Sequence, residues 1–177
     1  MSPSSDRPDR PGRHRRPKPT TRPATPDDVK VIAGFIRSLA AYENLSEKMV
    51  ATPEDYAAAF FGDNPRVFCE LGFVGDKPAG IAVWFYSFST FLGRHGLYLE
   101  DIFVDPAARG QGVGKALFAR LARRCIDEGL GRFEWTVLDW NKSAIGFYAA
   151  MGAPLNDSWV PVRMGREAIE KLAKECP

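Results

Sequence analysis

The stretch that decides the fold reads YLEDIFVDPAARGQGVGKA and runs from Tyr98 to Ala116. Up to Val104 its side chains follow the two-residue period of a β-strand, which would place Leu99, Asp101 and Phe103 on one face. Three glycines follow within five positions, and apolar residues then recur at helical spacing up to Cys125. The stretch therefore predicts a strand, a glycine-rich turn and a helix in immediate succession.

The glycine-rich turn has the composition of an anion-binding site. Backbone N–H groups at the start of a helix, aided by the helix dipole, bind phosphate groups, and Gly110, Gly112 and Gly114 let the backbone approach a diphosphate closely. A Walker A loop is excluded because Ala116 stands where a serine or threonine is required. The G-x-G-x-G spacing also differs from the dinucleotide-binding fingerprint. A turn that merely caps a helix is the remaining alternative.

Periodicity and turn signals along the chain predict a mixed α/β or α+β domain. Helices are expected at 25–42, 52–61, 113–129, 141–151 and 166–174, and strands at 67–74, 79–87, 97–104, 133–138 and 159–164. The first strands follow one another as a meander, and the later ones alternate with helices. This order indicates one sheet flanked by helices.

Charge is distributed unevenly along the chain. Residues 1–23 carry seven Lys or Arg against two Asp, whereas the remainder carries 17 basic and 20 acidic residues. We expect residues 1–20, rich in Pro and Arg, to be a disordered tail, and residues 21–177 to form one domain. The mildly acidic body argues against nucleic acid as a partner and fits a cationic substrate better.

Several classes of protein are disfavoured by composition. Three widely spaced cysteines and two histidines support neither a disulfide framework nor a metal site. No apolar run has the length of a membrane span, and the N-terminal residues lack the apolar stretch of a signal peptide. We expect a cytoplasmic protein without a metal and without a membrane partner.

Two signatures resemble those of the GNAT acetyltransferase superfamily. RGQGVG at 109–114, directly after LEDIFVDP, resembles its acetyl-CoA motif, and VLDWNKSAIGFYAAMGA at 137–153 resembles its second signature. The resemblance extends over about residues 21–175 and is greatest to the diamine and polyamine (spermidine/spermine-type) N-acetyltransferases. It implies a mixed, mostly antiparallel sheet of about six to seven strands flanked by helices, acetyl-CoA held where two strands splay apart, and a homodimer. It also implies a bulge near Glu100 and Asp101, which would change the faces on which these side chains lie.

The resemblance also implies which residues bind acetyl-CoA. Backbone groups of the strand would pair with the pantetheine chain, with the N–H of Phe103 polarising the thioester carbonyl, and the glycine-rich turn would hold the diphosphate. Asn141 would cap its helix and bind the pantetheine, although a plain helix cap is the alternative. The residues implied are Ile102, Phe103, Val104, Arg109, Gly110, Gln111, Gly112, Val113, Gly114, Lys115, Asn141, Ser143 and Ala144.

Amine acetylation sets chemical requirements that a few residues could meet. An alkylamine with a pKa near 10.4 is protonated at neutral pH, and removing its proton costs about 4.6 kcal/mol. By resemblance, Glu100 is the candidate base, directly or through water, and Tyr148 is the candidate general acid for the leaving thiolate. A solvent-facing carboxylate and an ordinary core aromatic are the respective alternatives.

The acceptor amine is expected to lie among acidic side chains. Tyr42 and Glu43 match the amine-binding helix end of the superfamily, and with Glu100 and Asp101 they would form an acidic funnel for a cation. Ser89 and Thr90 stand near the place where polyamine-acetylating relatives carry an acid, which weakens the case for spermidine itself. The expected acceptor class remains a diamine, a polyamine or a thialysine-like amino acid. The alternatives are a protein or peptide N-acetyltransferase, a non-catalytic acyl-CoA-binding module, and nucleic-acid binding through the basic tail.

Overall fold

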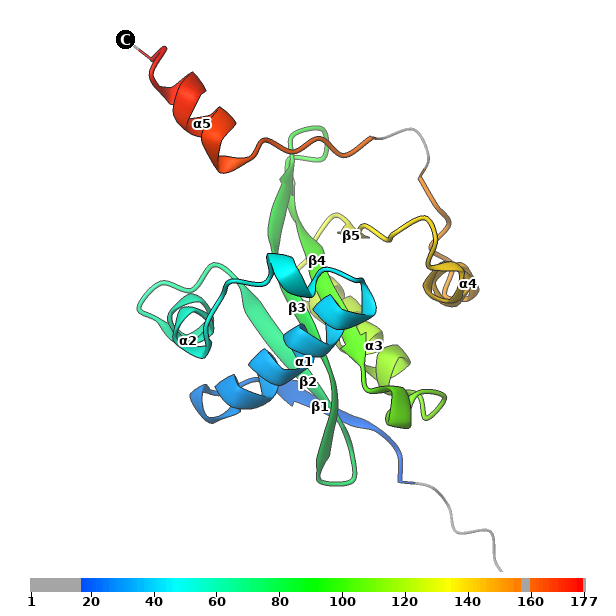
Figure 1. The fold of residues 1–177 in the computed structure, drawn as a ribbon. Helices are drawn as coiled ribbons and strands as arrows, with labels where there is room; N and C mark the ends of the chain where they lie inside the picture. Colours follow the sequence, from blue (N-terminus) through cyan, green and yellow to red (C-terminus); the bar gives the residue numbers. More distant parts are fainter. Residues whose placement is uncertain (1–16, 157–159, 177) are drawn as a thin grey trace, which may run out of the picture. The chain divides into compact units, whose positions relative to one another are not determined.

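The computed structural model describes residues 17–156 and 160–176 (Figure 1). They belong to two compact units, one that ends at Thr136 and one that begins at Val137. The first unit contains the sheet and the second contains two helices, and each is described by itself. Residues 1–16 of the expected tail lie outside the described part of the chain.

The first unit is a five-stranded sheet with helices packed on it. Its elements are β1 (Thr20–Pro23), η1 (Pro26–Asp28), α1 (Val29–Tyr42), η2 (Ser46–Lys48), α2 (Pro53–Phe61), β2 (Phe68–Val74), β3 (Lys77–Ser89), β4 (Arg94–Val104), η3 (Pro106–Ala108), α3 (Val113–Asp127) and β5 (Phe133–Trp135). The strands lie in the order β1-β2-β3-β4-β5, antiparallel except for the parallel pair β4–β5. The mixed, mostly antiparallel class is therefore confirmed, whereas the described residues form five strands instead of the expected six to seven.

The start of α1 shows why the sequence predicted a helix there. Thr25 and Asp28 form a reciprocal capping box around the short turn η1, which Pro26 opens. Arg22 holds the Asp28 carboxylate with two hydrogen bonds of 2.6 and 2.9 Å, and this pairing lowers the pKa of Asp28 to about 2. The ion pair also ties β1 to the helix, and β1 is a strand that the sequence pattern did not predict.

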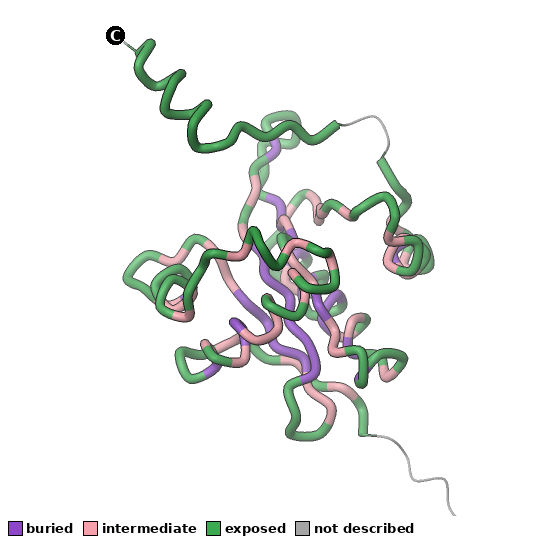
Figure 2. The backbone as a smooth tube through the Cα atoms, in the orientation of Figure 1, coloured by how far each residue is buried: buried purple, intermediate pink, exposed green. Residues whose placement is uncertain are grey.

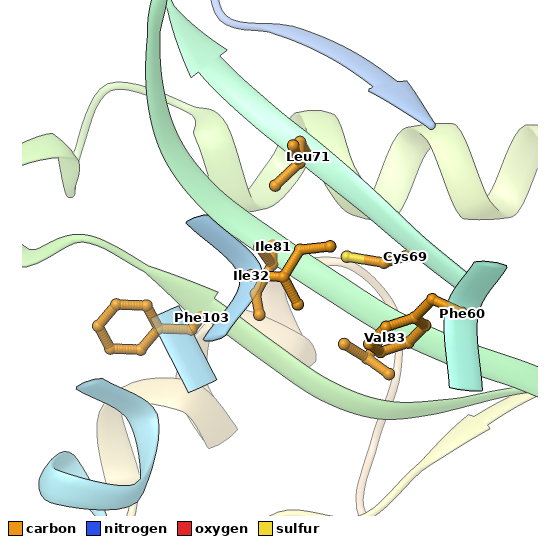
Figure 3. Packing of buried hydrophobic residues seen from close by; sticks show 7 residues of the cluster. All are labelled: Ile32, Phe60, Cys69, Leu71, Ile81, Val83 and Phe103. Carbon is orange, nitrogen blue, oxygen red and sulfur yellow. The ribbon is translucent and has the colours of Figure 1, made fainter. Parts of the chain in front are cut away.

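The two faces of the sheet are covered by different helices. Cys69 and Leu71 of β2 face α1 and α2, where they join an apolar cluster with side chains of β3 and β4 (Figure 3). The alternate residues of β2 face α3: Glu70 lies 3.4 Å from Arg120, and a Cβ added at Gly72 would lie 2.7 Å from Val113. Buried residues consequently run along the central strands (Figure 2). The sheet thus fixes the position of α3, and with it the turn that precedes α3.

A β-bulge interrupts β4 next to its two acidic residues. Val83 of β3 pairs with Asp101, but its neighbour Trp84 pairs with Leu99, so Glu100 is the extra residue. The bulge reverses the side-chain alternation that the sequence predicts. Leu99 keeps to the face of its partner Trp84, whereas Asp101 takes the opposite face with Val83 and Phe103. The expectation that Leu99, Asp101 and Phe103 share one face was therefore wrong.

The second unit begins at Val137. It contains α4 (Lys142–Ala150) and α5 (Arg166–Ala173). The strand expected at 159–164 is not present at residues 160–164, which are exposed and have no regular structure, and Trp159 lies outside the described residues. A period-two pattern forms a strand only when a neighbouring strand accepts its backbone hydrogen bonds, and no described strand pairs with this segment.

Candidate functional site

The turn between β4 and α3 has a backbone that requires glycine at two positions. Gly110 has a φ of 73° and Gly112, the N-cap of α3, has a φ of 88°. Residues other than glycine rarely adopt this left-handed region of backbone conformation. Two of the three glycines that marked the turn in the sequence are thus explained by its backbone geometry. The Gln111 amide donates to the Ala107 carbonyl at 3.1 Å and helps to close the turn.

The first turn of α3 presents backbone donors without a neighbouring acid. The N–H of Ala116 makes the first bond back to Gly112, at 2.9 Å, so the N–H groups of Val113, Gly114 and Lys115 have no partner within the helix. No acidic residue lies in this turn, and the exposed Lys115 adds positive charge. The buried side chain of Val113 anchors the turn against the sheet. These residues fit a bound diphosphate.

Arg109 connects this turn to two other elements of the first unit. Its Nε donates to the Val104 carbonyl at the end of β4, at 3.4 Å. Its guanidinium carbon lies 5.1 Å from the centroid of the Tyr42 ring, at the end of α1. Arg109 therefore lies between the glycine-rich turn and the helix end that the sequence assigns to acceptor binding.

The strands β4 and β5 pair over only three residues. Their register joins Leu97 to Phe133, Tyr98 to Glu134 and Leu99 to Trp135. From Asp101 to Val104, β4 is paired with β3 on one side, and no described strand pairs with its other side. An extended chain bearing amides can pair with such an edge. Ile102, Phe103 and Val104, predicted to bind pantetheine, lie in this stretch.

Three carboxylates gather beside the bulge, and we refer to Glu43, Glu100 and Asp101 as the acidic cluster. Glu43 is the C-cap of α1, and Glu100 is exposed at the bulge. Burial, followed by the charges of Glu100 and Glu43, raises the pKa of Asp101 to about 6. Burial also raises the pKa of Glu43. Because like charges disfavour one another, a cation placed here relieves their repulsion.

We expect Asp101→Asn to stabilise the fold and to weaken the binding of cationic acceptors. The pKa of Asp101 is raised, so the folded chain keeps this proton to higher pH than the unfolded chain does. The free energy of unfolding therefore falls between about pH 4 and pH 6, and the ionised group costs up to about 3 kcal/mol above about pH 7. Thermal unfolding should show a higher Tm for the variant above about pH 7 and a smaller difference at lower pH.

The exposed Asp63 provides the matched control, because Asp63→Asn removes the same charge outside the acidic cluster. It should leave the pH dependence of Tm unchanged. An Asp101→Asn variant whose Tm does not rise at high pH would contradict the description of the acidic cluster.

Two residues whose pKa is raised were not singled out from the sequence. The ring of Tyr56 in α2 stacks on that of Phe60, with the centroids 6.2 Å apart. Burial and the charge of Asp101 raise the pKa of Tyr56, so its phenol lies close enough to the acidic cluster to be affected by its charge. Glu70 is buried between Arg120 and Arg124 of α3 and fastens that helix to the sheet. The only feature of the sequence that could have indicated a role for Glu70 is its position as an acidic residue within an otherwise apolar strand.

The remaining predicted residues belong to the second unit. The Asn141 side chain accepts a hydrogen bond from the N–H of Ala144 at 3.2 Å, so it caps α4 as expected. Ser143 and Ala144 lie in the first turn of this helix. Tyr148 is buried on α4, with its ring 5.7 Å from that of Phe147. The structure thus brings together Tyr42, Glu43 and the residues of β4 and the glycine-rich turn in one unit, and the α4 residues in the other.

Comparison with known proteins identifies the class of protein to which this chain belongs. A solved structure of an integron cassette protein from the mobile metagenome of V. cholerae is similar, with a TM-score of 0.73 and 26% identity, over 89% of this chain and 98% of that one. The thialysine N-epsilon-acetyltransferase of Caenorhabditis elegans is 34% identical, over 85% of this chain and 94% of that protein. The L-ornithine N5-acetyltransferase of Arabidopsis thaliana is 30% identical, over 85% and 86%. The class is therefore that of acetyltransferases.

The family follows from a match that spans most of the chain. Residues 24–153 match the acetyltransferase (GNAT) family. The chain therefore belongs to this family and is an N-acetyltransferase, which confirms the family inferred from the two sequence signatures.

Within 17–156 and 160–176, no three His, Cys, Asp or Glu side chains are grouped so as to hold a metal ion. No helix in these ranges combines the length and apolar character needed to cross a membrane.

Proposed function

We propose that the chain transfers the acetyl group of acetyl-CoA directly to a primary amine of a small cationic acceptor. One observation carries the proposal: the acidic cluster and the glycine-rich start of α3 adjoin the same strand, β4, within one compact unit. A site for an anionic donor and a site for a cationic acceptor therefore lie at the two ends of the β4 stretch from Glu100 to Val104.

The donor site uses mainly backbone groups. Acetyl-CoA supplies an acetyl group activated as a thioester. The N–H groups at the start of α3, with Arg109 and Lys115, would bind the diphosphate, and the free edge of β4 would pair with the pantetheine amides. The N–H of Phe103 would donate to the thioester carbonyl oxygen. By the sequence resemblance, Asn141, Ser143 and Ala144 are further candidates for binding the donor.

In this proposal, side chains transfer the protons and bind the positively charged acceptor. Tyr42, Glu43 and Asp101 would hold the cationic acceptor, because a cation relieves the repulsion within the acidic cluster. Glu100, exposed beside them, would accept the proton of the attacking amine, directly or through water. Tyr148 would donate a proton to the leaving thiolate. The roles of Tyr148 and of the α4 residues rest on the sequence signature.

Direct transfer is favoured over an acyl-enzyme by the state of the cysteines. Burial raises the pKa of the Cys69 thiol to about 12 and also raises that of Cys125. The thiolate is the nucleophilic form, so both thiols are poor nucleophiles at neutral pH. Cys176, the third cysteine, is exposed and belongs to the second unit.

The acceptor class is supported by the relatives. Two of them are named for acetylating the side-chain amine of an amino acid, thialysine or L-ornithine. We therefore propose an amino acid with a terminal amine as the preferred acceptor, with diamines and polyamines as further candidates. We also expect a homodimer, as the sequence resemblance implies, and a cytoplasmic location, as the composition indicates.

A panel of amines tests this proposal. Thialysine, L-ornithine, L-lysine, putrescine and spermidine would be incubated with acetyl-CoA, and the released thiol would be followed with a thiol-detecting reagent. L-Norleucine is the matched control, because it keeps the α-amino and carboxylate groups of lysine and lacks the terminal amine. We expect thiol release with terminal amines and none with norleucine. Release that requires no amine, or no release with any of them, would contradict the proposal.

A further inference from the structure

Arg109 occupies a place that serves both proposed substrate sites. It belongs to the turn that precedes α3, yet its guanidinium lies over the ring of Tyr42 at 5.1 Å. That distance is within the range of about 6 Å over which a cation is attracted to an aromatic face. Tyr42 is followed directly by Glu43, a member of the acidic cluster. The guanidinium therefore lies where the acceptor site begins.

The contact with Tyr42 competes with the other role of Arg109. A diphosphate at the start of α3 attracts a guanidinium strongly, since charge-assisted hydrogen bonds to phosphate are stronger than neutral ones. A cationic acceptor would be drawn to the Tyr42 face for the same reason that Arg109 is. If the guanidinium must leave the Tyr42 ring to reach the diphosphate, Arg109 has two alternative positions. Occupying either position then changes the other site.

We propose that Arg109 couples the two sites: without the donor it covers the Tyr42 face, and a bound diphosphate draws it away and opens that face to the acceptor cation. This inference rests on the proposed function, because it takes the diphosphate of CoA and a cationic amine as the ligands. Donor binding then strengthens acceptor binding, and by linkage the acceptor strengthens donor binding by the same factor. Arg109 acts here as a positioning residue.

A purely structural role for the contact between Arg109 and Tyr42 predicts the opposite change in CoA affinity when the Tyr42 ring is removed. If the stacked ring held Arg109 ready for the diphosphate, removing the ring would weaken CoA binding. If Arg109 must leave the ring to reach the diphosphate, removing the ring strengthens CoA binding. The sign of a single change in affinity therefore separates the two roles.

Calorimetric titration with CoA, which carries no acetyl group to transfer, tests the proposal without an acceptor. Tyr42→Leu should bind CoA about two- to five-fold more tightly than the natural chain, the factor that corresponds to one exposed cation–π contact. Tyr42→Phe, which keeps the aromatic face, should bind CoA like the natural chain. In an Arg109→Gln background, Tyr42→Leu should change nothing. Thermal unfolding of each variant confirms that the compared proteins are folded.

A second titration examines the acceptor side with thialysine as the probe. Saturating CoA should tighten thialysine binding to the natural chain by a similar factor, and Arg109→Gln should bind thialysine equally well with and without CoA. Tyr42→Leu binding CoA no more tightly than the natural chain would overturn the coupling while leaving the proposed function intact. A natural chain that gives no heat with CoA would instead contradict the proposed function itself.

Discussion

Replacing Glu100 by glutamine is expected to lower kcat/KM for the acceptor amine by about 10²- to 10⁴-fold at neutral pH, the usual contribution of a general base. Glutamine preserves the size of the side chain and removes its capacity to accept the proton. The bulge places Glu100 at the surface beside Asp101, beyond the last residue that pairs with β5. The position is open to an amine and to water, as the role requires.

The pH profile distinguishes loss of a base from loss of binding. Without Glu100 the reaction depends on acceptor molecules that are already unprotonated, and this fraction rises about tenfold per pH unit below the pKa of the amine. The rate of Glu100→Gln should rise accordingly, whereas the natural enzyme should level off. Glu54→Gln, which removes an exposed carboxylate of α2, is the matched control and should keep the natural profile. A Glu100→Gln variant with the natural rate would remove Glu100 from its role.

Replacing Tyr148 by phenylalanine is expected to lower kcat by about 10²-fold and to leave the affinity for CoA unchanged. The change removes one hydroxyl from a buried ring and keeps its packing on α4. The effect should lie at the low end of the range for general acids, because a thiol with a pKa near 8.5 leaves readily as a thiolate. Steady-state kinetics and a CoA titration on the same preparation measure both quantities.

The neighbouring Phe147 provides a comparison within the same helix. Phe147→Leu alters an aromatic ring beside Tyr148 without removing a proton donor. It should lower kcat far less than Tyr148→Phe does. Natural turnover in Tyr148→Phe would mean that the thiolate leaves without its help.

Local patterns in the sequence were sufficient to predict most of the helices and strands of the first unit. The strand, turn and helix around Gly110 and Gly112 follow from local preferences: alternation, glycines for left-handed backbone, and helical spacing. The capping residues at Thr25 and Thr52 likewise fixed two helix starts, and both form reciprocal capping boxes. Such features depend on residues that are close together in the sequence, so they can be predicted from a single sequence.

Features that depend on distant partners were not visible. The bulge at Glu100 comes from the pairing of β4 with β3, and the alternation along β4 does not show it. Only the family resemblance implied a bulge near Glu100 and Asp101. The role of Glu70 depends on Arg120 and Arg124, which lie beside it only in the folded chain. The stacking of Arg109 on Tyr42 joins residues that are far apart in the sequence. Each of these needed the tertiary structure.

The claim on which the account depends is that the start of α3 binds the diphosphate of CoA, and a calorimetric titration of the chain with CoA measures it directly. We expect saturable heat that is largely lost in Gly112→Val, because a β-branched residue at a φ of 88° is strained and displaces the N–H groups of the helix start. Full CoA affinity in a folded Gly112→Val variant, or no heat with the natural chain, would contradict the account.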